Sequence, residues 1–224
     1  LRSRGLGDVY KRQALILDGE TRSKVYSPKD RRSAFLFGDG GVAALVERDE
    51  KFGKSYFSLN SDGSRADLIM IKGGGYRHPS SEETLREKVV DEYGNIRSDE
   101  QGYMQGGDVF NFVIREIPRD IKKTLEYAGD TADSFDYIVF HQANNFINAY
   151  IAKKMKLDTD KIPSTIAKYG NTSSVSVPLT IVSELKDRLY GNKKLLLSAF
   201  GVGMTWATGI VPFVDCKISD IVEV

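Results

Sequence analysis

The chain has 224 residues, with 32 Lys and Arg against 31 Asp and Glu, two histidines and one cysteine. A net charge of +1 gives no broad positive field, so we expect neither nucleic acid nor a membrane surface as a partner. The single cysteine excludes an internal disulfide framework and a Cys/His zinc site, and it favours a reducing, cytoplasmic compartment.

The first thirteen residues, "LRSRGLGDVYKRQ", differ from everything that follows. They are rich in Arg and Gly, have no hydrophobic periodicity, and stop abruptly before "ALILDG". They resemble the translated adapter sequences found at the edges of assembled gene fragments, although a solvated basic arm is the alternative. We therefore expect residues 1–13 to be a non-native tail and the natural chain to extend upstream of Ala14.

Short strands are predicted between residues 33 and 71. Residues 33–48 indicate a strand, a glycine turn at "GDGG" and a second strand, and "YFSLNSDGS" and "DLIMIKGGG" continue as short strands. Residues 73–103 are polar and contain many turn residues, which predicts a long surface loop. His78 lies in this loop, and we assign no chemistry to it.

From Gly107 onward helical and strand patterns alternate, which predicts an α/β protein. Apolar residues at spacings of three and four predict a helix through residue 125, which Pro118 interrupts and could kink. A buried strand over 137–140 ends at His141, and a helix begins near Asn144. The apolar stretch 195–214 contains "FGVG", so two core strands explain it better than a membrane-spanning helix.

Three polar segments share one kind of position, at a strand end or a helix start: "HQAN" (141–144), "YGNTS" (169–173) and "AFGVGMTW" (199–206). Such positions are where α/β sheets present binding groups. The imidazole of His141 and the carboxamide of Asn171 can both donate hydrogen bonds to an oxygen that becomes negatively charged. Taken alone, a core histidine, a turn-forming asparagine and turn glycines explain the same residues.

Five segments, in this order, resemble the carboxy-terminal half of β-ketoacyl-acyl-carrier-protein synthase III: "FGDGG", "SDGS", "HQANNFI", "YGNTSSVSVPL" and "AFGVGMTWATGIV". The combination of HQAN with GNTS makes the resemblance specific. It implies a thiolase-like α/β fold of two similar halves, each with a mixed sheet and helices. Residues 14–48 would then end the amino-terminal half, 49–103 would be connecting strands and a polar loop, and 104–224 would form the carboxy-terminal catalytic half.

This family performs a decarboxylative Claisen condensation in fatty-acid biosynthesis, with acyl-coenzyme A and malonyl-acyl carrier protein as substrates and no cofactor or metal. The motif match implies that His141 and Asn171 hydrogen-bond the malonyl thioester oxygen as its enolate forms. A backbone N–H in the turn around Gly201 and Gly203 would hold the acyl-enzyme oxyanion. The full-length protein is expected to be a homodimer.

The resemblance also implies substrate contacts. Asn144 would contact the pantetheine arm, Phe110 would line its channel, and Arg31 would stack on the adenine of coenzyme A. Lys153 and Lys154 would dock the acidic carrier protein, although a solvated lysine face is an almost equal explanation.

Two positions depart from the family pattern. Phe146 replaces a carrier-docking arginine, and Gly107 replaces a pantetheine-binding asparagine. Both departures leave the oxyanion chemistry intact and put the identity of the thioester partner in doubt.

The family's nucleophilic cysteine, which begins a helix in the amino-terminal half, has no counterpart here. Cys216 follows the last predicted core strand, without a helix start beside it, and is interpreted as an incidental thiol. We therefore expect a fragment of an acyltransferase that is inactive alone. The alternatives are a specialised relative that makes a polyketide-type product or uses another acyl acceptor, and a catalytically silent half that binds a thioester or a partner subunit.

Overall fold

The structure is a computed structural model that describes residues 13–48 and 52–223. The predicted tail lies outside the described residues, apart from Gln13, which begins the first strand. The helices and strands are β1 (Gln13–Glu20), β2 (Gly40–Glu47), β3 (Tyr56–Ser61), β4 (Ile69–Ile71), α1 (Glu82–Leu85), β5 (Lys88–Val89), β6 (Ile96–Arg97), β7 (Gly102–Met104), α2 (Gly106–Ala128), β8 (Tyr137–Phe140), α3 (Asn145–Met155), α4 (Ile166–Tyr169), α5 (Ser176–Leu185), β9 (Asn192–Gly201) and β10 (Thr205–Val214).

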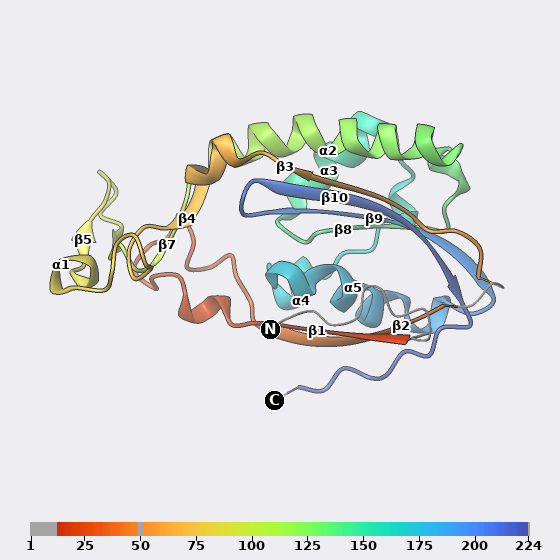
Figure 1. Cartoon of the computed structure of the whole chain (residues 1–224), viewed down its shortest axis with the longest axis horizontal. Helices are drawn as coiled ribbons and strands as arrows, with labels where there is room; N and C mark the ends of the chain where they lie inside the picture. Colours follow the sequence, from red (N-terminus) through yellow and green to blue (C-terminus); the bar gives the residue numbers. More distant parts are fainter. Residues whose placement is uncertain (1–12, 49–51, 224) are drawn as a thin grey trace.

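The elements form alternating layers of helix and sheet (Figure 1). The central sheet has the strand order β3-β10-β9-β8, in which β8 runs parallel to β9 and the other pairs are antiparallel. Helices α2 and α3 cover one face of this sheet, and α4 and α5 cover the other. Strands β1 and β2 pair with each other in a second sheet beyond α5. The architecture is the mixed α/β fold that the sequence predicts.

Strand β8 shows why the core has two parts. Successive side chains of a strand point to opposite faces of a sheet. Ile138 accordingly belongs to the larger apolar cluster under α2 and α3, whereas Val139 belongs to the smaller cluster under α5. Helix α2 supplies the larger cluster with side chains at spacings of three and four, and it continues unbroken through Pro118. The end of β8 is therefore held from both sides, which fixes the residue that follows it.

The predicted strand pair near the carboxyl end is confirmed. β9 and β10 are antiparallel neighbours over their full lengths, with Gly201 opposite Thr205 across the turn. Among the described helices, none is both long and apolar enough to cross a membrane.

The predicted hairpin within residues 33–48 is wrong. Only Gly40–Glu47 forms a strand, and its partner is β1 rather than the preceding segment. Residues 33–36 form turns instead, because the carbonyl of Asp30 accepts hydrogen bonds from the backbone N–H groups of Ser33 and Ala34. The chain then makes an isolated parallel bridge from Phe37 to Asn171. Apolar composition alone did not reveal this local turn geometry.

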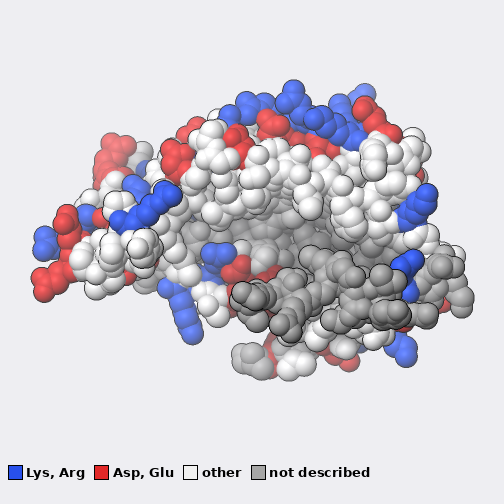
Figure 2. Space-filling view, viewed as in Figure 1, with Lys and Arg blue, Asp and Glu red and all other residues white. Residues whose placement is uncertain are grey.

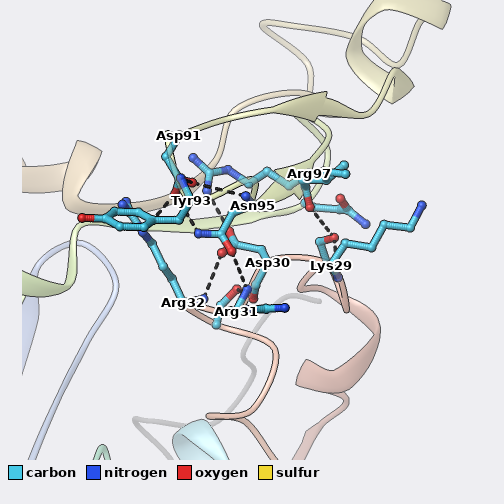
Figure 3. A network of polar contacts seen from close by, with 12 residues as sticks. Lys29, Asp30, Arg31, Arg32, Asp91, Tyr93, Asn95 and Arg97 are labelled. Atoms are coloured by element: carbon cyan, nitrogen blue, oxygen red, sulfur yellow. Dashed lines mark hydrogen bonds and ion pairs between the residues drawn. The ribbon is translucent and has the colours of Figure 1, made fainter.

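The predicted polar loop over residues 73–103 contains short ordered elements, which project from the body of the molecule (Figure 1). Figure 3 shows the polar network that fastens them to the loop around residue 30. Arg97 forms an ion pair with buried Asp30 at 2.8 Å, and the side chain of Asn95 accepts the N–H of Arg31 at 2.9 Å. Outside this network, His78 is exposed, as predicted.

Candidate active site

A cavity of about 730 Å³ lies where the end of β8, the start of α3, the loop before α5 and the β9–β10 turn meet. Figure 2 shows the face of the molecule hollowed near its middle. Four of the predicted site side chains line this cavity, namely those of Phe110, His141, Asn144 and Asn171. Gly201 also lines it, whereas Gly203 lies outside its lining. Three segments far apart in the sequence therefore meet at one site.

His141 is held by contacts on each side. Its backbone N–H donates to Ser198 of β9, and its carbonyl accepts from the side chain of Asn148 in α3. The ring of Phe200 meets the imidazole edge-on, with centroids 5.0 Å apart. The hydroxyl of Ser176, at the start of α5, lies 2.6 Å from Nδ1. Only Nε2 is left to act on a ligand.

The hydrogen bonds around Ser176 assign the tautomer of His141. The Ser176 hydroxyl is buried and accepts the backbone N–H of Gln142 at 3.3 Å. Its own hydrogen needs an acceptor, because buried hydroxyl groups are almost always satisfied. Nδ1 of His141 is that acceptor, so the ring proton is placed on Nε2. The nitrogen that faces a ligand is then a hydrogen-bond donor.

Burial keeps the imidazole neutral. It lowers the pKa of His141 from 6.5 to about 4 and outweighs a hydrogen bond with the backbone of Ser173, which acts in the opposite direction. A charged imidazolium would have to give up its hydration in this site. At neutral pH His141 can therefore donate a hydrogen bond through Nε2 to a ligand without carrying a charge.

Asn171 is fixed by its own turn. Its Oδ1 accepts the N–H of Ser173 at 2.9 Å, and its backbone forms hydrogen bonds with Leu36 and Gly38 on both sides of the Phe37 bridge. A Cβ on Gly38 would lie 2.1 Å from the carbonyl oxygen of Tyr169, so this close approach requires glycine. With Oδ1 occupied, the amide Nδ2 is the group that can donate to a ligand.

Gln142, the second residue of the HQAN motif, has a structural role. It is fully buried; its Nε2 donates to the carbonyl of Phe140, and its Oε1 accepts from the N–H of Thr165 at 3.0 Å and the hydroxyl of Ser164. These bonds join the end of β8 to the loop before α4. They hold in place the backbone from which His141 projects.

Phe110 and Asn144 have the positions expected of substrate-contacting residues, but their roles stay predictions. Phe110 projects from α2 and stacks on Phe146, with ring centroids 5.3 Å apart. Asn144 caps α3, because its Oδ1 accepts the N–H of Ile147 at 2.9 Å. Its Nδ2 is the remaining donor toward the cavity.

Arg31, Lys153 and Lys154 lie away from the cavity lining. Arg31 is exposed, and its backbone N–H belongs to the network of Figure 3. Lys153 is exposed on α3, whereas the ammonium of Lys154 donates to the carbonyl of Ile114 in α2 at 2.7 Å. Lys154 therefore joins two helices, and its predicted docking role would compete with this contact.

Sequence reasoning missed three residues of the site: Arg22, Ser176 and Trp206. Arg22 and Trp206 line the cavity, and Ser176 orients His141. Ser176 lies within the quoted GNTSSVS segment, so a buried serine at a helix start was a usable signal. Arg22 gave no such signal, because its segment has no recognisable motif.

Cys216 follows β10 and is exposed as a residue, but the neighbouring chain desolvates its thiol enough to raise the pKa, which disfavours the thiolate. It is absent from the cavity lining. Among the residues that the structure describes, no group of three or more His, Cys, Asp or Glu side chains could hold a metal ion.

Comparisons with known proteins agree with the geometry. The family described as 3-oxoacyl-[acyl-carrier-protein (ACP)] synthase III C terminal matches residues 125–213, and the one described as 3-oxoacyl-[acyl-carrier-protein (ACP)] synthase III matches residues 7–63. The chain is 34% identical over 203 residues to a β-ketoacyl-[acyl-carrier-protein] synthase III of Streptococcus pneumoniae, covering 89% of this chain and 59% of that protein.

Solved structures show the same similarity. The 3-oxoacyl-(acyl-carrier protein) synthase of Burkholderia xenovorans LB400 aligns with a TM-score of 0.83 at 36% identity, covering 95% of this chain and 59% of that one. The priming β-ketosynthase of the R1128 polyketide pathway aligns with a TM-score of 0.75 at 25% identity, covering 91% and 58%. These neighbours confirm the thiolase-like fold class, and the chain spans about 60% of their length.

Proposed function

This chain belongs to the 3-oxoacyl-[acyl-carrier-protein] synthase III family, and from that premise we propose that its cavity binds a malonyl thioester and stabilises the enolate formed by decarboxylation. The observation that carries the proposal is that His141 and Asn171 line the same cavity. Nδ1 of His141 and Oδ1 of Asn171 already have hydrogen-bond partners, so Nε2 and Nδ2 are available to a ligand. The imidazole is fixed by Ser176, and the carboxamide is fixed by the N–H of Ser173.

In the proposed step, the thioester oxygen accepts hydrogen bonds from Nε2 of His141 and Nδ2 of Asn171. The bond to the carboxylate carbon breaks, CO₂ leaves, and the electron pair becomes an enolate whose charge rests on the thioester oxygen. Two fixed donors stabilise this charge more than they stabilise the neutral carbonyl, so they lower the barrier.

In the complete condensation, the enolate carbon attacks an acyl group carried on a cysteine and expels the thiolate. Cys216 does not suit that role, because it is exposed and lies outside the cavity lining. The chain itself would supply the residues that catalyse the decarboxylation step. We propose acyl-coenzyme A, acyl carrier protein and a cytoplasmic homodimer as the wider context of the reaction.

The experiment measures CO₂ release from a malonyl thioester of pantetheine, with and without the chain. This half-reaction needs no cysteine, so the chain can catalyse it although we expect the chain alone to be inactive in the complete condensation. Replacing either donor, by His141→Ala or Asn171→Ala, is expected to lower the rate by about 10²–10³, the usual cost of one oxyanion donor. His78→Ala and Asn192→Ala are matched controls, because both residues are exposed and absent from the cavity lining. Equal rates for all variants would refute the proposal.

The acceptor is a separate question, and one observation favours an alternative to the standard carrier protein. Phe146, at the position of a docking arginine in the family, stacks on Phe110 instead of presenting a charge, and Lys154 is bonded to the backbone of α2. A specialised relative with a different acyl acceptor is therefore the second candidate. An assay that exchanges malonyl-carrier protein for malonyl-coenzyme A separates the two, because equal use of both argues against carrier docking.

A further inference from the structure

One ion pair lies in the wall of the cavity, on the side formed by the segment that follows β1. Arg22 and Glu20 both line the cavity, together with Tyr26, Leu36 and Phe37. Nη2 of Arg22 donates to Oε1 of Glu20 at 3.1 Å, and Nε lies 2.9 Å from Oε2 without the alignment of a hydrogen bond. The two side chains are only 27% and 17% exposed, so the pair is largely removed from water.

The remaining ionisable groups of the cavity lining are uncharged at neutral pH. Burial lowers the pKa of His141 to about 4 and raises the pKa of Tyr26. Burial would also raise the pKa of Glu20, but the hydroxyl of Ser174 and the guanidinium of Arg22 outweigh it and lower that pKa overall. Glu20 is therefore ionised, and among the described residues that line the cavity the charged side chains are those of this pair.

The two partners differ in what they can offer a ligand. Oε1 of Glu20 accepts hydrogen bonds from Arg22 and from the Ser174 hydroxyl at 2.7 Å, and Oε2 lies against Nε of Arg22. Arg22 has five N–H donors, and Glu20 accepts one of them in a well-aligned bond. Within the described part of the chain, the other N–H groups of Arg22 have no hydrogen-bond acceptor, so the pair offers a ligand chiefly donors.

The position of the pair shows which part of a ligand would meet it. The bond from Ser174 to Glu20 places the pair beside the loop that follows Asn171. Phe110, in contrast, projects from α2, and Figure 1 shows α2 and β1 on opposite sides of the central sheet. A thioester with its oxygen at Asn171 and its pantetheine arm along Phe110 would direct its acyl chain toward Arg22.

We propose that Arg22 makes the cavity selective for thioesters whose acyl chain carries an oxygen acceptor, such as an oxo, hydroxyl or carboxylate oxygen, over plain hydrocarbon chains. The inference rests on the proposed function in that the ligand is a thioester. A hydrocarbon chain would cover the spare donors of Arg22 without satisfying them, and a site built for hydrogen bonding rejects ligands that lack the partner group.

The experiment compares two probes of equal chain length, the hexanoyl and oxohexanoyl thioesters of pantetheine. Trp206 is the single tryptophan of the chain and lines the cavity, so its fluorescence reports binding. The oxohexanoyl thioester is expected to bind about tenfold more tightly, equivalent to about 1.4 kcal/mol. The double variant Glu20→Gln/Arg22→Leu is expected to bind the two probes equally, without leaving a buried carboxylate unpaired.

Arg119→Leu is the matched control, because Arg119 is an exposed ion-paired arginine on α2 and is absent from the cavity lining. It should keep the preference. Equal binding of both probes by the unaltered chain, or a preference that survives in the double variant, would overturn the inference. If the double variant does not fold, Glu20→Gln/Arg22→Met replaces it, with the same expected loss of preference, because Met has no hydrogen-bond donor and Gln carries no charge that needs a partner.

Failure of this inference and failure of the proposed function can be distinguished. CO₂ release from a malonyl thioester depends on His141 and Asn171 and involves no long acyl chain. If neither hexanoyl probe binds while CO₂ release still requires both residues, the assignment of Arg22 is wrong and the proposed function stands.

Discussion

The neutral, buried imidazole of His141 predicts a specific loss of stability in acid. In the unfolded chain the imidazole has its ordinary pKa of 6.5, whereas in the folded protein the pKa is lowered to about 4. Between these values the unfolded state binds a proton that the folded state does not, so the free energy of unfolding falls as the pH decreases from 6.5 to about 4. The shift corresponds to a loss of about 3 kcal/mol.

The assay is urea unfolding followed by the fluorescence of Trp206 at a series of pH values. His141→Gln removes the titrating group, and the difference between this variant and the unaltered chain isolates its contribution from that of the carboxylates. His78→Gln is the control, because it removes the other imidazole from an exposed position. If His141→Gln and the unaltered chain lose stability in parallel between pH 6.5 and 4, the assigned neutrality of His141 is wrong.

Three further predictions concern the surroundings of the site. Ser176→Ala should leave the fold intact and lower the free energy of unfolding in urea by about 1 kcal/mol. It should lower the rate of CO₂ release at least about tenfold, because His141 loses the partner that sets its tautomer. An unchanged rate of CO₂ release would contradict the assigned tautomer. Asp120→Asn should lower the free energy of unfolding by about 2–3 kcal/mol, because the buried carboxylate accepts hydrogen bonds from three side chains of β3 and β10. A loss of stability below about 0.5 kcal/mol would count against this role of Asp120. Residues 14–224 expressed alone should self-associate, because the paired leucines Leu15 and Leu45 are each 62% exposed on the sheet of β1 and β2. The double variant Leu15→Ser/Leu45→Ser should favour the monomer. An unaltered chain that is monomeric in analytical ultracentrifugation would refute this prediction.

Elements with one strong periodicity were predictable from the sequence. Helix α2 follows from its apolar spacing, and β8 follows from four apolar residues that fit between two helical layers. The hairpin within 33–48 was wrong because β1, the true partner of β2, precedes it in the chain, and the turns around Asp30 depend on buried backbone hydrogen bonds. Pairing between distant strands leaves little trace in local sequence.

The site was predictable only where motifs marked it. HQAN and GNTS located His141 and Asn171, and the structure brings both to one cavity. The tautomer of His141 required the position of Ser176, which is 35 residues away in the chain. Arg31 was expected at the ligand and lies outside the cavity lining, whereas Arg22 lines it. Which of several arginines in one segment faces a cavity is decided by turns that the sequence pattern does not determine.

The most direct test of the account is a crystal structure of the chain with a non-cleavable malonyl thioester analogue bound. We predict that one oxygen of the analogue lies about 2.7–3.1 Å from both Nε2 of His141 and Nδ2 of Asn171. An oxygen that contacts only one of these nitrogens, or an analogue bound elsewhere on the chain, would contradict the shared role of the two residues.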